Sequence, residues 1–334
     1  MRFTATKPDM KSLPLLLLSL GALAAARAAS PPLSIAVIPM GTTHEFWKTI
    51  HAGAMKAQHD LAADGTAINV LWVGPLREDN RGGQVEVVED MVARHVSGIV
   101  LSPIDDRALV APVEDAVEAK IPVVIIGSIL RSTKYSSFIA TDNREGGRLA
   151  ARRLGALLGG TGKAMLLRVQ VGSAGSVERE EGFLEVMRRD FPHIELVSTE
   201  EHGGATRDTA FTVSENLLGR FGQELTGIFT PNESTTVGML LALREAGLAG
   251  KVKFVGFDAS PSLVEAVKSG EIQGLVIQDP FMMGYLGVKA VVAVLQGGKT
   301  DPVVATRLGF VTRENLDDPS IVEMIHPPLA KWLP

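Results

Sequence analysis

The sequence predicts an α/β protein whose parallel sheets are covered by helices on both faces, and three observations support this. Short apolar runs alternate along the chain with amphipathic segments of helix length. The runs are rich in Val, Ile and Leu without polar alternation, which is typical of parallel strands buried on both faces. At 334 residues, of which 46% are hydrophobic, the chain is also long enough for two domains of ordinary size.

Ten apolar runs mark the expected strands. The segments between the runs, such as 45–65 and 208–222, repeat apolar residues at helical spacing and end at glycine. The spacing of strand, helix and strand recurs in the two halves, so two Rossmann-like lobes are expected; chance similarity between such units is the alternative. In chain order the runs are 33–40, 67–74, 98–103, 122–128, 136–143, 163–170, 194–201, 227–234, 253–260 and 274–280.

The first thirty residues differ from the rest of the chain. Basic residues within 1–11 precede the apolar stretch 12–26, and small residues two apart, Ala26 and Ala28, follow it. This order predicts a secretory signal peptide over 1–28, because the apolar stretch is too short to span a bilayer as a helix. A membrane anchor or a disordered tail is the alternative. Cleavage near Ala28 would release the mature protein into a bacterial periplasm.

Composition and motifs argue against several classes of function. The formal net charge is −5 without a polybasic block, so no nucleic-acid partner is expected, and the absence of cysteine excludes disulfides and thiolate catalysis. Segment 159–164 has the Gly-Lys of a phosphate loop, but Leu157 and Ala164 replace the required glycine and hydroxyl residue. No G-x-S-x-G or H-x-x-x-H pattern occurs. We therefore expect no enzyme activity, no cofactor and no metal.

Polar residues follow several expected strands at the place where parallel sheets bind ligands, beyond the carboxyl ends. Two lobes with facing strand ends would bring these residues to one cleft. Asp accepts hydroxyl hydrogens, while Asn and Gln both donate and accept, so the set suits a ligand dense in hydroxyl groups. Phe46 and Trp47 would cover its apolar face. The other members of the set are Gly127, Ser128, Asn232, Asp258 and Gln278.

Each of these residues also has a purely structural interpretation. Asn232 or Asp258 would cap the helix that follows it. One of Phe46 and Trp47 would belong to the core in any case, and Gln278 before Asp-Pro would be a strand-to-turn residue. Their common position at strand ends favours the binding interpretation.

These residues and the segments around them resemble the type I periplasmic binding proteins of the ribose and galactose group. The resemblance covers almost all of the mature chain, and it implies two lobes joined by three crossing segments. Such proteins hold a small sugar between the lobes and deliver it to an ABC importer or a chemoreceptor. The matching segments are "IAVIPMGTTHEFWKTIHAGAMKA", "VSGIVLSPIDDRALVAPVEDAVEAKIPVV", "ATDNREGGRLAA", "SVEREEGFLEVM", "GIFTPNESTTVGMLLALREAG", "VGFDASP" and "GLVIQDPFMMGYLGV".

Carried over residue by residue, the resemblance implies that Phe46 and Trp47 stack on the sugar. It also implies that Arg179 binds sugar hydroxyls, since an arginine fork fits adjacent oxygens. The alternative for Arg179 is a surface ion pair with Glu178 or Glu180, which would contribute little. The other polar ligands of the family match Asn232, Asp258 and Gln278.

The chain departs from the ribose-type pattern at several positions. Gly127-Ser128 stands where those members carry Asp-Arg, and Ala205 stands at a position that can be aromatic. The pocket should be roomier and less aromatic than in ribose-type members. Ribose is therefore not carried over as the ligand, and the sequence does not identify the sugar. Ser128 is kept as a candidate contact. His44 falls where ribose-type members have a polar ligand, although an exposed helix start would also explain it.

We therefore predict a monomeric periplasmic solute-binding protein that delivers a sugar or sugar-like polyol to the membrane permease of an ABC importer. The lobes should comprise 31–141 plus 280–304 and 142–278 plus 307–334, with a hinge near Thr141, Asp279 and Thr306. Three alternatives remain. A ligand-sensing domain for chemotaxis or signalling shares these features; a transcription regulator would need an N-terminal helix-turn-helix; and a secreted α/β enzyme would need an activated nucleophile or an acid–base pair.

Overall fold

The computed structural model describes residues 1–5 and 31–333, and the chain from Pro32 onward forms one compact unit. The predicted signal cleavage site and the apolar stretch before it fall within 6–30, outside the described residues. Across the part of the chain that is described, no helix has the length and apolar character needed to cross a membrane.

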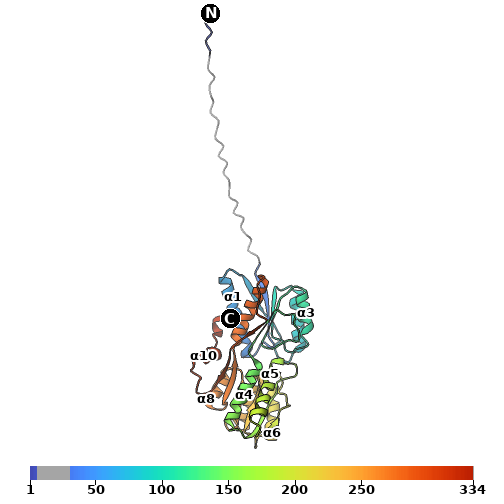
Figure 1. Cartoon of the computed structure of the whole chain (residues 1–334), viewed down its shortest axis with the longest axis vertical. Coiled ribbons are helices and arrows are strands. Elements are labelled where there is room, and N and C mark those ends of the chain that lie inside the picture. The colour runs from blue at the N-terminus through green and yellow to red at the C-terminus, as the bar shows by residue number, and fades with distance from the viewer. Residues whose placement is uncertain (6–30, 334) are drawn as a thin grey trace. The chain divides into compact units, whose positions relative to one another are not determined.

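The first sheet consists of six parallel strands in the order β11-β5-β4-β3-β1-β2. Within β1, Ile35 and Val37 pack in a cluster with residues of α1 and α9, whereas Ala36 and Ile38 pack with residues of α2 and α3. Both faces of the strand are buried, which explains why its sequence lacks polar alternation. Figure 1 shows α1 and α3 on opposite sides of this sheet. The elements are β1 (Leu33–Ile38), α1 (Glu45–Ala63), β2 (Ile68–Trp72), α2 (Arg81–Ala93), β3 (Gly98–Leu101), α3 (Val110–Glu118), β4 (Val123–Ile126), β5 (Ser137–Ala140), α9 (Pro280–Leu295) and β11 (Val303–Ala305).

The second sheet has the order β12-β10-β9-β8-β6-β7, and only the β10–β12 pair is antiparallel. Helices α4 and α5 cover one face, and α6, α7 and α8 cover the other. The elements are α4 (Asn143–Leu157), β6 (Gly162–Leu166), α5 (Ala174–Asp190), β7 (Ile194–Ser198), α6 (Arg207–Phe221), β8 (Gly227–Phe229), α7 (Glu233–Glu245), β9 (Lys253–Phe257), α8 (Pro261–Ser269), β10 (Gly274–Gln278), β12 (Leu308–Val311) and α10 (Pro319–Ile325). The last helix, α11 (Leu329–Trp332), packs against α1 beside the first sheet.

The two sheets share one topology. The first sheet has the order β2-β1-β3-β4-β5-β11, and the second has the order β7-β6-β8-β9-β10-β12. In each, the second strand of the lobe lies at one edge, next to the first, third, fourth and fifth strands in turn. A strand from late in the chain, β11 or β12, forms the other edge. This confirms the prediction of two Rossmann-like lobes with doubly wound sheets. We call them the first lobe, built on β1–β5 and β11, and the second lobe, built on β6–β10 and β12. The ten expected strands are present; β11 and β12, with the sequences VVA and LGFV, were not predicted.

The chain passes between the lobes after β5, after β10 and between β11 and β12. The three passages lie together: Thr141 Oγ1 is 3.2 Å from Thr306 Oγ1, and the Thr306 N–H donates to the Ala140 carbonyl at 3.0 Å. Arg307 Nε donates to Asp279 Oδ2 at 2.7 Å, while Asp279 Oδ1 caps α9 by accepting from Met282 N–H. Hydrogen bonds therefore link all three connections to one another.

Each lobe also contains one helix pair that packs at very short range through reciprocal glycines. A Cβ added at Gly53 in α1 would lie 1.9 Å from the Phe281 carbonyl oxygen in α9, and one at Gly284 in α9 would lie 2.0 Å from that of Ile50. In the second lobe Gly147 of α4 and Gly182 of α5 show the same arrangement. These backbones approach so closely that only glycine fits between them.

Replacing Gly53 with alanine should therefore destabilise the protein by about 1–3 kcal/mol, the range for overpacking a filled interior. The matched control is Gly219→Ala in α6, where an added Cβ meets nothing within 4 Å. That change should be neutral or stabilise by up to about 1 kcal/mol, since alanine favours helix. Urea unfolding of both variants measures the difference. Equal stability of the two would show that α1 can move away from α9 without loss.

Candidate ligand-binding site

A pocket lies between the lobes, at the carboxyl ends of the strands of both sheets. The structure brings seven of the eight predicted site residues into its lining, all except His44. The first lobe contributes Met40, Phe46, Trp47, Glu78, Ser102, Gly127 and Ser128. The second lobe contributes Val169, Gln170, Ser173, Gly175, Ser176, Arg179, Asn232, Glu233, Asp258 and Gln278.

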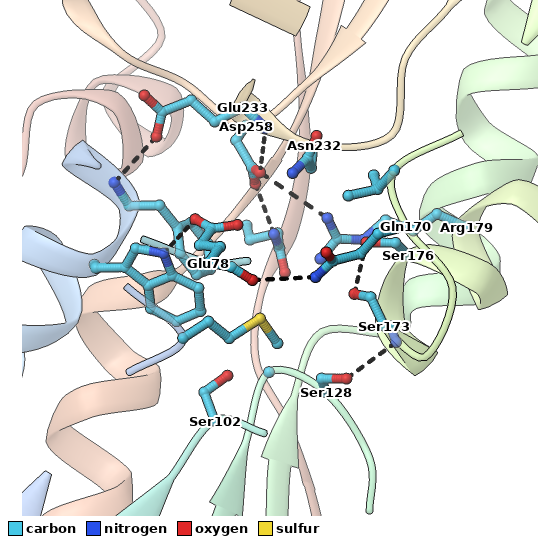
Figure 2. Close-up of a pocket in the computed structure, with 17 residues that line it drawn as sticks. Glu78, Ser102, Ser128, Gln170, Ser173, Ser176, Arg179, Asn232, Glu233 and Asp258 are labelled. Atoms are coloured by element: carbon cyan, nitrogen blue, oxygen red, sulfur yellow. Dashed lines mark hydrogen bonds and ion pairs between the residues drawn. The ribbon is translucent and has the colours of Figure 1, made fainter. Parts of the chain in front are cut away.

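Asp258 connects the polar groups of the second lobe and is only 6% exposed. Its Oδ1 accepts from Gln278 Nε2 at 2.6 Å, and its Oδ2 accepts from the backbone N–H of Glu233 at 3.1 Å. Arg179 Nη1 lies 3.9 Å from the same Oδ2 (Figure 2). Burial raises the pKa of Asp258 above its ordinary value, and the Arg179 charge and the two hydrogen bonds oppose that rise without cancelling it.

Arg179 is buried, so the alternative of a surface ion pair is wrong. Its Nε donates to Asn143 Oδ1 at 2.8 Å, its Nη1 donates to the Pro231 carbonyl at 2.9 Å, and its guanidinium lies 4.1 Å from the centre of the Phe257 ring. The neighbouring Glu180 pairs with Arg168 instead, at 2.8 Å. One arginine thereby ties α5 to α4, to the segment before α7 and to β9.

The capping interpretation holds for Asn232 but not for Asp258. Asn232 is the N-cap of α7, and its Oδ1 accepts from the Thr235 N–H at 3.0 Å. Asn232 also lines the pocket, in addition to capping the helix. The N-cap of α8 is Ser260, two residues beyond Asp258. Asp258 instead adopts a left-handed backbone with φ of 66°, a conformation that Asp tolerates better than most residues and that is frequent at functional sites.

The two predicted aromatic residues lie side by side at the start of α1, edge to face with ring centroids 4.9 Å apart. Trp47 is 4% exposed and belongs to the apolar cluster of the first lobe while also lining the pocket. The interpretation that one of the pair is a core residue is therefore confirmed for Trp47. Its indole Nε1 donates to Glu78 Oε1 at 2.5 Å.

Several polar groups in the pocket are acceptors. Ser128 Oγ accepts from the Gly175 N–H of the second lobe at 3.1 Å. Gln278 Oε1 and Ser102 Oγ are buried and have no hydrogen-bond partner among the described residues. A buried polar atom without a partner is unfavourable unless something supplies the missing hydrogen bond. Gln278 Oε1 therefore marks a place where a donor is expected, and the Ser102 hydroxyl marks a place where either a donor or an acceptor is expected.

His44 lies outside the pocket lining. It occupies the N-cap position of α1 without making a side-chain cap, and its Nδ1 is 2.7 Å from Glu78 Oε1. The geometry of His44 therefore does not support contact with the ligand. Its ring instead contacts the Glu78 carboxylate, and Glu78 lines the pocket. Ala205, which departs from the ribose-type sequence pattern, is buried and also lies outside the pocket lining.

Several lining residues were missed by the sequence analysis. Glu78 and Ser102 follow β2 and β3, so the strand-end rule that selected Asp258 would have found them. Gln170 is the last residue of the expected run 163–170, Ser173 is the N-cap of α5, and Ser176 lies in the first turn of that helix. Glu233 is the first residue of α7, next to Asn232, and the sequence analysis did not select it. No cluster of three or more His, Asp or Glu among the described residues could hold a metal ion.

The fold agrees with that of related proteins. A family model described as periplasmic binding protein domain matches residues 35–300. A ribose import binding protein of Haemophilus influenzae is 28% identical over 87% of this chain and 95% of its own length. A xylitol-binding protein of Mycolicibacterium smegmatis is 26% identical over 77% of this chain and 72% of its own.

Two solved structures are similar along the whole fold. A carbohydrate transporter solute binding protein from Agrobacterium radiobacter, in complex with D-arabinose, superimposes with a TM-score of 0.82 at 32% identity, covering 88% of this chain and 99% of that one. An ABC transporter solute binding protein from Agrobacterium vitis with bound D-fucose superimposes with a TM-score of 0.82 at 33% sequence identity. The match covers 88% of this chain and 100% of that one. The family consists of solute-binding proteins and not of enzymes. The chain therefore belongs to the periplasmic binding protein family, in the group that serves sugar ABC transporters.

Proposed function

We propose that this protein captures a sugar or sugar-like polyol in the pocket between its lobes and delivers it to the permease of an ABC importer. The observation that carries the proposal is the buried set of Asp258, Arg179 and Gln278 facing the aromatic pair of α1. Carboxylate, amide and guanidinium groups match the hydroxyls of a carbohydrate, while the aromatic side chains match its C–H face. The sugars named for the relatives, among them ribose, xylitol, D-arabinose and D-fucose, supply the first candidates.

We further propose that the lobes close about a hinge at Thr141, Asp279 and Thr306. The lobes would then comprise 31–141 plus 280–304 and 142–278 plus 307–334, except that the last helix, Leu329–Trp332, packs against α1 of the first lobe. Support comes from the mutual hydrogen bonds of the three connections, which make them a single pivot. Hinge closure of this kind is the behaviour expected of periplasmic binding proteins.

Contacts across the pocket would stabilise the closed arrangement. Besides the Gly175–Ser128 bond, Asn143 Nδ2 donates to the Gly127 carbonyl at 3.1 Å, and the Phe46 N–H donates to Glu233 Oε2 at 3.4 Å. His44 adds charge to this region. Burial disfavours its charged form, but the hydrogen bond and charge of Glu78 and the charge of Glu233 outweigh burial and raise the pKa of His44 above 6.5.

Export is part of the same proposal, since delivery to an importer requires the protein on the outer side of the inner membrane. The support is the order of basic, apolar and small residues in the first 28 positions, together with membership of a periplasmic family.

The binding function is tested first by thermal shift of the mature protein with D-ribose, D-arabinose, D-fucose, D-allose, D-tagatose and xylitol. Asp258→Asn should then weaken the best binder by about 2 kcal/mol, roughly thirtyfold, because a charged acceptor is lost. Asp79→Asn is the control, since Asp79 is exposed and pairs with Arg77 outside the lining. The ligand-free Asp258→Asn protein should lose stability too, so titration calorimetry is run well below its melting temperature. Normal affinity would show that Asp258 does not contact the ligand.

The raised pKa of His44 predicts a pH-dependent stability. Its contribution is fully present below the ordinary value of 6.5 and is lost as pH rises through the higher folded-state pKa. The stability of the wild type relative to His44→Gln should therefore fall as the pH rises above about 6.5. His51, whose pKa is lowered by burial, gives the control of opposite sign: relative to His51→Gln, the wild type should gain stability as pH rises. If the stability differences from His44→Gln and from His51→Gln changed with pH in the same direction, the opposite pKa shifts assigned to His44 and His51 would be contradicted.

The export proposal predicts a mature N-terminus near Ala29 when the full chain is expressed in a Gram-negative host. Mass spectrometry of the periplasmic fraction measures it. Recovery of the uncleaved chain in the cytoplasm would rule out the signal peptide.

A further inference from the structure

Glu78 is a buried acid in an exposed loop. It lies in the segment between β2 and α2, where Leu76 is 71% exposed, yet Glu78 itself is 8% exposed and lines the pocket. The loop packs tightly against the end of β1: a Cβ on Gly41 would lie 3.1 Å from Glu78 Cγ. Figure 2 shows Glu78 across the pocket from Arg179, Ser173 and Ser176 of the second lobe.

One carboxylate oxygen of Glu78 is fixed and the other is free. Oε1 accepts from Trp47 Nε1 at 2.5 Å and lies 2.7 Å from His44 Nδ1. The backbone carbonyl of Glu78 accepts from Gln170 Nε2 of the second lobe at 3.2 Å. Oε2 makes no hydrogen bond to any described residue. A side chain held through one oxygen in this way presents the other at a defined place in the pocket.

The charges around the pocket are unequally matched. Glu233 forms an ion pair with Arg207, and Asp258 lies beside Arg179. Glu78 has no arginine or lysine within ion-pair distance among the described residues, and its one titratable partner is His44, whose pKa it raises. Glu78 Oε2 and Gln278 Oε1 are therefore two acceptors of the lining without a hydrogen-bond donor among the described residues.

We propose that Glu78 is a specificity-determining residue of this site, which accepts a hydroxyl hydrogen from an uncharged sugar or polyol and rejects sugar acids. The inference rests on the proposed function and names the substrate class more narrowly. A neutral carbohydrate supplies hydroxyl hydrogens to Glu78 Oε2 and Gln278 Oε1. A carboxylate in the same place would supply none there, and it would stand against Glu78 at short range away from bulk water, where like charges repel strongly.

The test compares wild type, Glu78→Gln, Glu78→Asp and Asp79→Asn by titration calorimetry at one pH. The probes are the best neutral binder of the sugar panel and two sugar acids, D-arabinonate and D-galacturonate. In the wild type both acids should bind at least 100-fold more weakly than the neutral sugar. Glu78→Gln keeps the shape and removes the charge, so it should weaken the neutral sugar about tenfold and tighten at least one acid tenfold or more. Asp79→Asn removes one negative charge from an exposed neighbour. It should change neither the affinity for the neutral sugar nor the affinity for the acids.

Glu78→Asp keeps the charge but withdraws it by one methylene. It should weaken the neutral sugar while still rejecting both acids, which separates charge from shape and decides the question if Glu78→Gln does not fold. Unchanged acid affinity in a folded Glu78→Gln, or acid binding by Glu78→Asp, would overturn the role of Glu78. A wild type that binds no neutral member of the panel but does bind an acid would overturn the proposed function itself.

Discussion

The arrangement of the site depends on the buried contact between Arg179 and Asp258. A guanidinium and a carboxylate are both costly to bury, and they are tolerated here because each is also hydrogen-bonded to its surroundings. Those partners belong to α4, the segment before α7, and β10. The contact consequently fixes the relative positions of most elements that form the second lobe's side of the pocket, and it does so through groups that also face the ligand.

Most side chains of the pocket have a structural task as well as a place in its lining. Asn232 caps α7, Trp47 fills the first lobe's core, and Ser128 binds a backbone amide across the pocket. The structural and functional interpretations of such residues are therefore not exclusive. A side chain held by packing or by a cap loses less freedom when a ligand binds, which is the physical basis of preorganisation.

The two lobes repeat not only a strand order but also a way of packing helices. In each, two glycines let a pair of helices approach until backbone meets backbone, α1 with α9 and α4 with α5. Helix α9 packs on the first sheet although it follows β10 of the second, so the close pair in the first lobe anchors the chain immediately after a crossing. Under the proposed hinge, rigid lobes on both sides of the three short connections would confine movement to those connections.

The sequence by itself determined the ten principal strands, the two similar lobes and the strand ends at which the site forms. Hydrophobic periodicity is a local property, and the rule that parallel sheets bind ligands at their carboxyl ends needs no long-range information. That is why Asn232, Asp258 and Gln278 could be selected from their places in the chain. The resemblance to a known family added Arg179 and the stacking role of the aromatic pair.

Only the tertiary structure decided which polar residue does what. Nothing local shows that Arg179 turns inward while its neighbour Glu180 pairs with Arg168, or that His44 holds Glu78 instead of facing the pocket. Strands β11 and β12 likewise form only because the chain returns to sheet edges laid down far earlier in the sequence. Burial and pairing are set by residues far apart in the chain, and a local pattern carries no record of them. The contact between Phe46 and Glu233, for example, joins residues 187 positions apart.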